Sequence, residues 1–239
     1  MDVREAIQQG ATVRLQELLA KGVNLDAKDD DERTPLHWAA GQGSLDAVEL
    51  LVTQAKARLD VQDDAGWTPL MSAASAGHAE IVSFLLSRGA NANIANDSGQ
   101  VPLHYHKGRL HIAELLVDYT KNINHQDSTG NTPLMRALGG TPSREVITLL
   151  IDYGARVNTK DKQGNTPLHL ALAEGHEDIA RLLVELGADP MAKNESGVRC
   201  MTLARPAFRA EMQKAVGVGA APSVNRLIID GCYHSSHTR

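Results

Sequence analysis

Large aromatic side chains are scarce in this chain. Aromatic residues make up 3% of its 239 residues, and two of them are tryptophans. A core with so few rings must be filled by small and aliphatic side chains, as happens where helices pack closely. Cysteine is scarcer still, because Cys200 and Cys232 are the only two. This number excludes a disulfide framework and fits a reducing compartment.

Long apolar runs and an excess of basic residues are also missing. No apolar run approaches the roughly 20 residues that cross a bilayer, and residues 1–5 do not resemble a secretory signal. Lys and Arg number 24 against 29 Asp and Glu, which gives a formal net charge of −5. Such a balance argues against a surface for nucleic acid. We expect a soluble intracellular protein that binds neither membrane nor nucleic acid.

Catalytic and metal-binding motifs are missing as well. The chain has no G-x-S-x-G, no H-E-x-x-H and no phosphate loop. A metal could be imagined at His104, His106 and His111, or at the histidines around Cys232. Neither group contains a complete tetrahedral ligand set. We therefore expect no enzyme, no cofactor and no metal.

One repeating unit is present instead, most clearly in residues 63–93. Thr68 is placed to cap a helix whose first residue is Pro69, where a missing N–H costs nothing. Gly77 should end this helix. Residues 79–87 carry apolar side chains at the spacing of a second amphipathic helix, and Gly89 should end that one. The unit therefore predicts a turn followed by two helices.

The same landmarks recur at Pro35, Pro69, Pro102, Pro133 and Pro167, with spacings of 34, 33, 31 and 34 residues. A period near 33 with the motif T-P-L-H-x-A is typical of ankyrin repeats. We predict an all-α ankyrin-repeat solenoid of helix-turn-helix units with short β-turn fingers. Its expected parts are an N-terminal capping repeat (1–30), five internal repeats (31–194), a C-terminal capping repeat (195–216) and a disordered tail (217–239).

Two repeats depart from the pattern. Glu32 stands where the other turns carry glycine, so this turn should be slightly strained. The fourth repeat has two residues fewer between Val101 and Gly108 than its neighbours have. This removes about 200° of rotation and about 3 Å of helix. We expect a shortened or unwound helix there, with the weakest packing of the stack.

The motif histidines should have a structural role. We expect the rings of His37, His104 and His169 to satisfy backbone groups in the turns. What then remains for function is the concave face, which the turns and the first helices of such stacks line.

By register, Arg33, Asp64, Trp67, Lys107 and Glu174 belong to this concave face. Trp67 is either a binding hot spot or a side chain that lies on the neighbouring turn, and Trp38 is expected to be half buried. Arg33, Lys107 and Arg109 add basic groups among acidic turns. The acidic run 29–33 is either a solvated loop or a further partner contact. The predicted partner-binding residues are Arg33, Trp38, Asp64, Trp67, Lys107, Arg109 and Glu174.

The chain resembles the gankyrin family in several segments that occur in the same order. They are R-T-P-L-H-W from Arg33, D-D-A-G-W-T-P-L from Asp63 and A-L-A-E-G-H from Ala171. These proteins are the ankyrin-type subunits of the proteasome regulatory particle and their fungal counterparts. The resemblance spans about residues 2–216. It implies a monomeric assembly chaperone of the cytoplasm and nucleus.

The resemblance also implies a partner and a site. The partner would be the C-terminal domain of a proteasomal base ATPase, held on the concave face. Arg33 and Lys107 would pair with acidic residues of that domain, with Asp64 and Trp67 beside them. The alternative is an adaptor or inhibitor that uses the same face for a signalling or cell-cycle client.

Overall fold

The computed structural model describes residues 2–24 and 26–217, which fall into two compact units, Met1–Ala204 and Arg205–Arg239. Pairs of helices repeat through the first unit, and the described part of the second holds one helix, α13 (Pro206–Gly217). Within the described ranges the chain forms no β-strand beyond one isolated bridge between Lys193 and Arg199. None of the described helices is both long and apolar enough to span a bilayer. The all-helical ankyrin-repeat prediction is confirmed.

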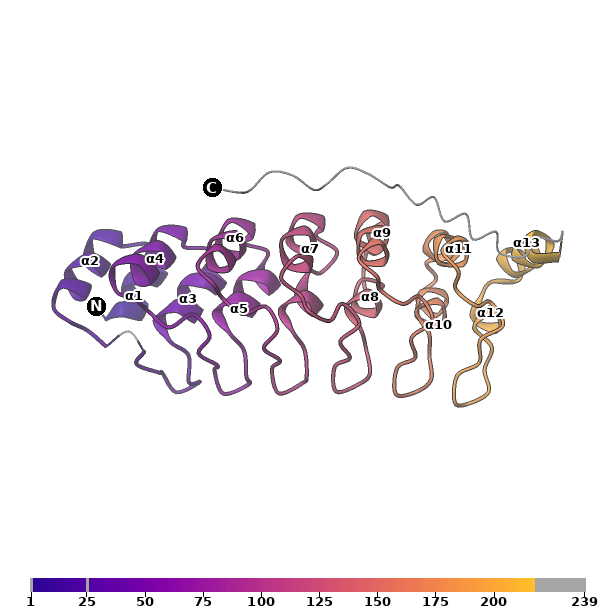
Figure 1. Ribbon diagram of the computed structural model, residues 1–239, viewed down its shortest axis with the longest axis horizontal. Coiled ribbons are helices and arrows are strands. Elements are labelled where there is room, and N and C mark those ends of the chain that lie inside the picture. Colours follow the sequence, from indigo (N-terminus) through magenta and orange to yellow (C-terminus); the bar gives the residue numbers. More distant parts are fainter. Residues whose placement is uncertain (1, 25, 218–239) are drawn as a thin grey trace. The chain divides into compact units, whose positions relative to one another are not determined.

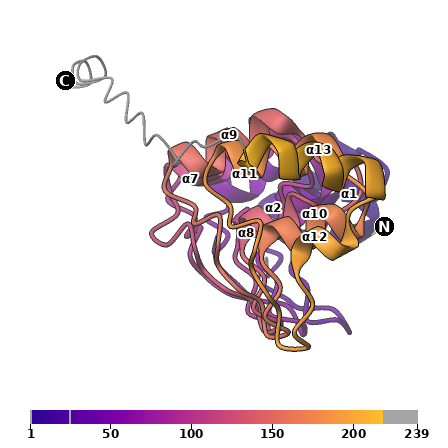
Figure 2. The ribbon, with the colours of Figure 1, turned by 90° about the vertical axis from the view of Figure 1, so that its right-hand side faces the viewer.

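The helices of the first unit lie in two rows (Figure 1). The inner row consists of α1 (Val3–Gln8), α3 (Pro35–Gln42), α5 (Pro69–Ala76), the 3₁₀ helix η2 (Pro102–Tyr105), α8 (Pro133–Arg136), α10 (Pro167–Ala173) and α12 (Cys200–Leu203). The outer row consists of α2 (Thr12–Ala20), α4 (Leu45–Glu49) with the π-helix η1 (Leu50–Gln54), α6 (Ala79–Ser87), α7 (Leu110–Val117), α9 (Arg144–Asp152) and α11 (Glu177–Glu185). Between successive pairs, the loops project from the helices in one direction (Figure 2).

The inner helices begin as the sequence predicts. The Thr68 hydroxyl accepts a hydrogen bond from the Met71 N–H at 3.3 Å, and Pro69 is the first helical residue. Gly77 ends α5 in the left-handed conformation, with φ at 90°. The leucine of each motif is fully buried between the rows, in the order Leu36, Leu70, Leu103, Leu134 and Leu168. This single strip of apolar contacts is the core of the stack.

The shortened fourth repeat replaces an eight-residue helix with the four residues of η2. Behind η2 the chain turns through His106, Lys107 and Gly108, the last two with φ at 48° and 72°. The His106 ring is fully buried and reaches the Pro133 carbonyl of α8. On the concave side, a recess of about 450 Å³ remains between η2 and the loop after α8.

Two non-glycine residues mark strained turns in the second repeat. Glu32 has φ at 55°, as its position among the glycine turns predicts, and its carboxylate pairs with Lys28 at 2.8 Å. Lys56 has φ at 54°, and the sequence analysis missed it. It follows η1, whose wider turn absorbs the additional residue of this repeat. The next residue, Ala57, donates its N–H back to the Leu51 carbonyl of η1. Ala90, the residue after Gly89, donates back to the Leu85 carbonyl of α6 in the same way.

We expect Lys56→Gly to raise the free energy of unfolding by about 1 kcal/mol, because glycine adopts a positive φ without steric cost. The Lys56 side chain is exposed, so little contact is lost with it. Urea denaturation followed by circular dichroism measures the change. Lys56→Ala is the control, since it removes the same side chain but keeps the strain; an equal gain in both variants would contradict the explanation.

The repeat and cap boundaries stay predictions. The expected C-terminal cap (195–216) crosses the division between the two units. The expected disordered tail (217–239) lies outside the described residues except for Gly217, which ends α13.

Candidate protein-binding groove

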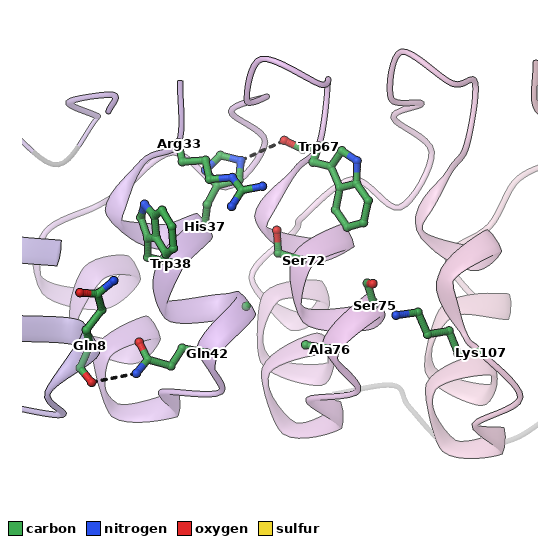
Figure 3. Close-up of a pocket in the computed structure, with 11 residues that line it drawn as sticks. Gln8, Arg33, His37, Trp38, Gln42, Trp67, Ser72, Ser75, Ala76 and Lys107 are labelled. Atoms are coloured by element: carbon green, nitrogen blue, oxygen red, sulfur yellow. Dashed lines mark hydrogen bonds between the residues drawn. The ribbon is translucent and has the colours of Figure 1, made fainter. Parts of the chain in front are cut away.

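A groove of about 520 Å³ runs along α3 and α5, from the end of α1 to the turn after η2. Its lining includes four of the predicted partner-binding residues, Arg33, Trp38, Trp67 and Lys107, together with Gln8, His37, Gly41, Gln42, Ser72, Ser75 and Ala76 (Figure 3). None of these described lining residues is Asp or Glu. The groove is therefore cationic in a chain whose formal net charge is −5.

The motif histidine His37 holds one wall of the groove. Its Nδ1 accepts a hydrogen bond from the Thr34 N–H at 3.1 Å, so the proton lies on Nε2 and is donated to the Trp67 carbonyl at 2.9 Å. Burial lowers the pKa of His37, which keeps the ring neutral. The ring thereby ties the second repeat to the third at the residue that carries the Trp67 indole.

Trp38 stands on α3 as a half-buried side chain, as predicted. Its Nε1–H donates to Asp29 at 2.7 Å, and the Arg4 guanidinium lies 4.0 Å from the ring centroid. The Arg33 guanidinium lies 5.3 Å from the same ring. The acidic loop thus contributes a carboxylate that orients the indole. The two nearby guanidinium groups are attracted to the ring face, which helps to hold the indole in place on the groove wall.

Arg33 already has an intramolecular partner. Its Nε donates to the Asp63 carboxylate at 3.2 Å, where the Asp63 side chain is 1% exposed and that of Arg33 40% exposed. The pair joins two neighbouring turns. Part of the Arg33 charge is therefore neutralised inside the protein, and an Arg33 substitution will change stability as well as binding.

Trp67 is half buried and packs against Tyr105 of η2, with the ring centroids 4.5 Å apart and the ring planes tilted by 46°. The indole therefore rests on the neighbouring repeat, and it also lines the groove. The two roles that the sequence analysis left as alternatives are therefore compatible. Tyr105 is itself fixed by hydrogen bonds with Asn96 and Gln100.

Lys107 lies at the far end of the groove, with its side chain directed toward Ser75 (Figure 3). It is exposed, and its ammonium group forms no ion pair with any of the residues that the structure describes. Lys107 is consequently the cation of the groove with most charge left for a partner.

The other three predicted residues lie outside the groove lining. Asp64 is exposed at the tip of its turn, and Glu174 is exposed at the end of α10 in the sixth repeat. The Arg109 guanidinium donates to the Ser75 carbonyl at 3.2 Å and covers Gly77. The structure therefore brings four of the seven predicted residues together.

The histidines considered for metal binding have other partners. The His104 ring donates to the Asn131 carbonyl, the His106 ring to the Pro133 carbonyl, and exposed His111 lies 3.5 Å from Glu114. Among residues 2–24 and 26–217, no three His, Cys, Asp or Glu side chains are grouped as a metal would require. The second imagined site, around Cys232, falls outside the described residues.

The sequence analysis missed Tyr105 and Ser72 as residues of the concave face, although a signal was available. Each stands nine residues after the Asp or Asn of its turn, as Trp38 does after Asp29. From this position a side chain reaches back to the turn residue, as Tyr105 does to Asn96 and Trp38 to Asp29. This offset marks residues of the inner helices that face the concave side: Trp38 and Ser72 line the groove, and Tyr105 lines the recess beside η2.

Comparison with known proteins matches the chain to the family described as "Ankyrin repeats (3 copies)", in overlapping segments 4–96, 52–127, 88–161 and 103–194. The chain is 40% identical over 56 residues to the 26S proteasome non-ATPase regulatory subunit 10 of Dictyostelium discoideum. It is 34% identical over 128 residues to the probable 26S proteasome regulatory subunit p28 of Saccharomyces cerevisiae. A putative palmitoyltransferase, ZDHHC13 of Danio rerio, is 32% identical over 210 residues.

The alignments cover only part of each of these relatives. The alignments span 23%, 51% and 85% of this chain, but only 24%, 56% and 32% of those three relatives. The crystal structure of the human ASB11 ankyrin repeat domain superimposes with a TM-score of 0.77 at 27% identity, over 92% of this chain and 99% of that one. Ankyrin repeats present an extended concave surface for binding proteins, and the family is not typically catalytic. The chain belongs to the ankyrin-repeat family, as a protein-binding repeat domain.

Proposed function

We propose that this protein is an assembly chaperone of the proteasome regulatory particle, and that its groove binds the C-terminal domain of one base ATPase subunit. The cationic groove that ends at the unpaired Lys107 carries the proposal. Its charges suit an acidic surface, and Trp38 and Trp67 add apolar contact in the same groove. The likeness to two proteasome regulatory subunits supports this choice of partner.

Binding of the recombinant chain to the C-terminal domain of each base ATPase tests the proposal. One of these domains should bind, with an affinity that falls as salt is raised, because the attraction between exposed charges is screened. Lys107→Glu should weaken this binding about tenfold or more. It is preferable to an Arg33 variant, which would also break the ion pair with Asp63.

Lys121→Glu is the matched control. Lys121 is exposed and lies outside the groove lining, so its replacement changes the net charge equally but should leave the affinity within about twofold. If a folded chain binds none of the ATPase domains, or if both variants weaken binding equally, the proposal is wrong. The groove then serves another client, as in an adaptor of signalling or cell-cycle proteins.

A further inference from the structure

Lys107 reaches the groove from an unusual backbone conformation. It has φ at 48° and is followed by Gly108 with φ at 72°. A lysine in this left-handed region is disfavoured because its Cβ crowds the backbone. Gly108 adopts its positive φ freely, but the lysine persists in this conformation only where the surrounding structure holds it.

The His106 ring makes two hydrogen bonds that hold the turn containing Lys107. Its Nδ1 accepts a hydrogen bond from the Gly108 N–H at 3.0 Å, and its Nε2–H donates to the Pro133 carbonyl at 3.2 Å. The ring is fully buried, and burial lowers its pKa, so the neutral form that makes both bonds is retained. One bond closes the turn around Lys107, and the other anchors that turn to α8.

From this geometry we infer that His106 is a positioning residue for partner binding: it locks the turn 106–108 so that Lys107 extends along the groove toward Ser75. This inference rests on the proposed function of the groove. It also explains how the groove keeps its terminal cation although the fourth repeat has lost two residues. The buried ring takes the place of the missing helical turn in directing the side chain.

Two substitutions separate the two bonds of the ring. In His106→Asn, the side-chain oxygen can accept from the Gly108 N–H, as Asn96 accepts from the Ser98 N–H two residues on at 3.1 Å. In His106→Gln, the longer amide can donate to the Pro133 carbonyl but does not reproduce the turn. Both variants should lose stability. Only in the glutamine variant should the Lys107 side chain no longer extend along the groove toward Ser75.

The first measurement needs no partner. Nuclear Overhauser contacts between the Lys107 methylenes and Ser75 or Ala76 are expected in the wild type and in His106→Asn, and should vanish in His106→Gln. Unfolding curves recorded beforehand show whether each variant is folded. If His106→Gln does not fold, His106→Asn decides: contacts that are lost in this variant would overturn the inference.

The second measurement is affinity for the ATPase domain. His106→Gln should weaken binding about tenfold, like Lys107→Met, whereas His106→Asn should stay within about twofold of the wild type. The double variant His106→Gln, Lys107→Met should bind no more weakly than Lys107→Met alone, because His106 acts through Lys107. Additive losses, or wild-type affinity in a folded His106→Gln, would refute the inference. If the nuclear Overhauser contacts behave as expected but no ATPase domain binds the wild type, the positioning stands and the proposed function fails.

Discussion

Replacement of Asp127 by alanine is expected to lower the free energy of unfolding by about 3 kcal/mol. The Asp127 side chain is 1% exposed. One carboxylate oxygen accepts the backbone N–H groups of Thr129 and Asn131, both at 2.9 Å, and the Thr129 hydroxyl at 2.6 Å. The other accepts from Arg136 at 2.5 Å and Gln100 at 3.3 Å. One side chain thus closes its turn and joins the fourth repeat to the fifth.

The large expected loss comes from the groups that alanine leaves behind. The N–H groups of Thr129 and Asn131 would lose their acceptor, and the Arg136 guanidinium would lose its counterion. Hydrogen bonds to a charged group contribute about 1.5–3 kcal/mol each. The Arg136 side chain is 39% exposed, so water can solvate its charge and the loss of its counterion adds little. Urea denaturation followed by circular dichroism gives the difference from the wild type.

Asp64→Ala is the matched control for this prediction. Asp64 is also a turn aspartate, but it is exposed, and its backbone N–H, not its carboxylate, makes a hydrogen bond, to the Asp31 carbonyl at 3.2 Å. Its replacement should change the free energy of unfolding by no more than about 0.5 kcal/mol. Similar losses at both positions would show that the bonds of the buried carboxylate are not the cause.

The pKa of Asp127 gives an independent signature of the same bonds. Burial raises this pKa, but the hydrogen bonds from Thr129, Arg136 and Asn131 outweigh burial and hold it well below the ordinary value of 3.8. Because the folded state has the lower pKa, the stabilisation is complete above about pH 4 and is lost as the pH falls below it.

The fold could be predicted from the sequence because ankyrin landmarks are local. A Thr-Pro pair begins a helix and a glycine ends it through contacts within a few residues, so the spacing of Pro35, Pro69 and the later prolines was sufficient. The positive φ of Glu32 followed from the same comparison of equivalent positions. Lys56 was missed because the wider turn of η1 shifts its register by one residue.

The site could be predicted only in part, because its details depend on contacts between repeats. Register placed Arg33, Trp67 and Lys107 on the concave face. It could not show that Arg33 is paired with Asp63, 30 residues away, or that Trp67 rests on Tyr105. The two-residue deletion in the fourth repeat also could not show how the chain is held where the helix is shortened. Such contacts follow from how neighbouring repeats stack, which the periodic pattern alone does not record.

The second large effect is expected from His104 when the pH falls from 7 to 4. Its Nδ1 accepts from the Val101 N–H at 3.2 Å, and its Nε2–H donates to the Asn131 carbonyl at 3.2 Å. Burial lowers the pKa of His104 from 6.5 to about 4. The unfolded chain therefore binds a proton near pH 6.5 that the folded chain does not yet bind. Stability is complete above that pH and is lost as the pH falls toward 4, by about 3 kcal/mol from this residue.

The chain itself contains a replacement that should remove this loss. The third and fifth repeats carry Met71 and Met135 at the position of His104, each after a threonine cap. Val101→Thr, His104→Met gives the fourth repeat the same motif. At pH 7 the variant should be about 1 kcal/mol less stable, because the bond to the Asn131 carbonyl is lost. At pH 4 it should be the more stable protein.

Urea unfolding at several pH values between 7 and 4 distinguishes His104 from the other buried histidines. Burial also lowers the pKa values of His37 and His106, so part of the acid loss should persist in the variant. Val101→Thr alone is the control and should keep the full pH dependence of the wild type. If the double variant loses stability as steeply as this control, His104 is not the group that titrates, and the ring is protonated in both states or in neither. If only the double variant is flatter, the motif histidine is a source of acid sensitivity as well as a link between repeats.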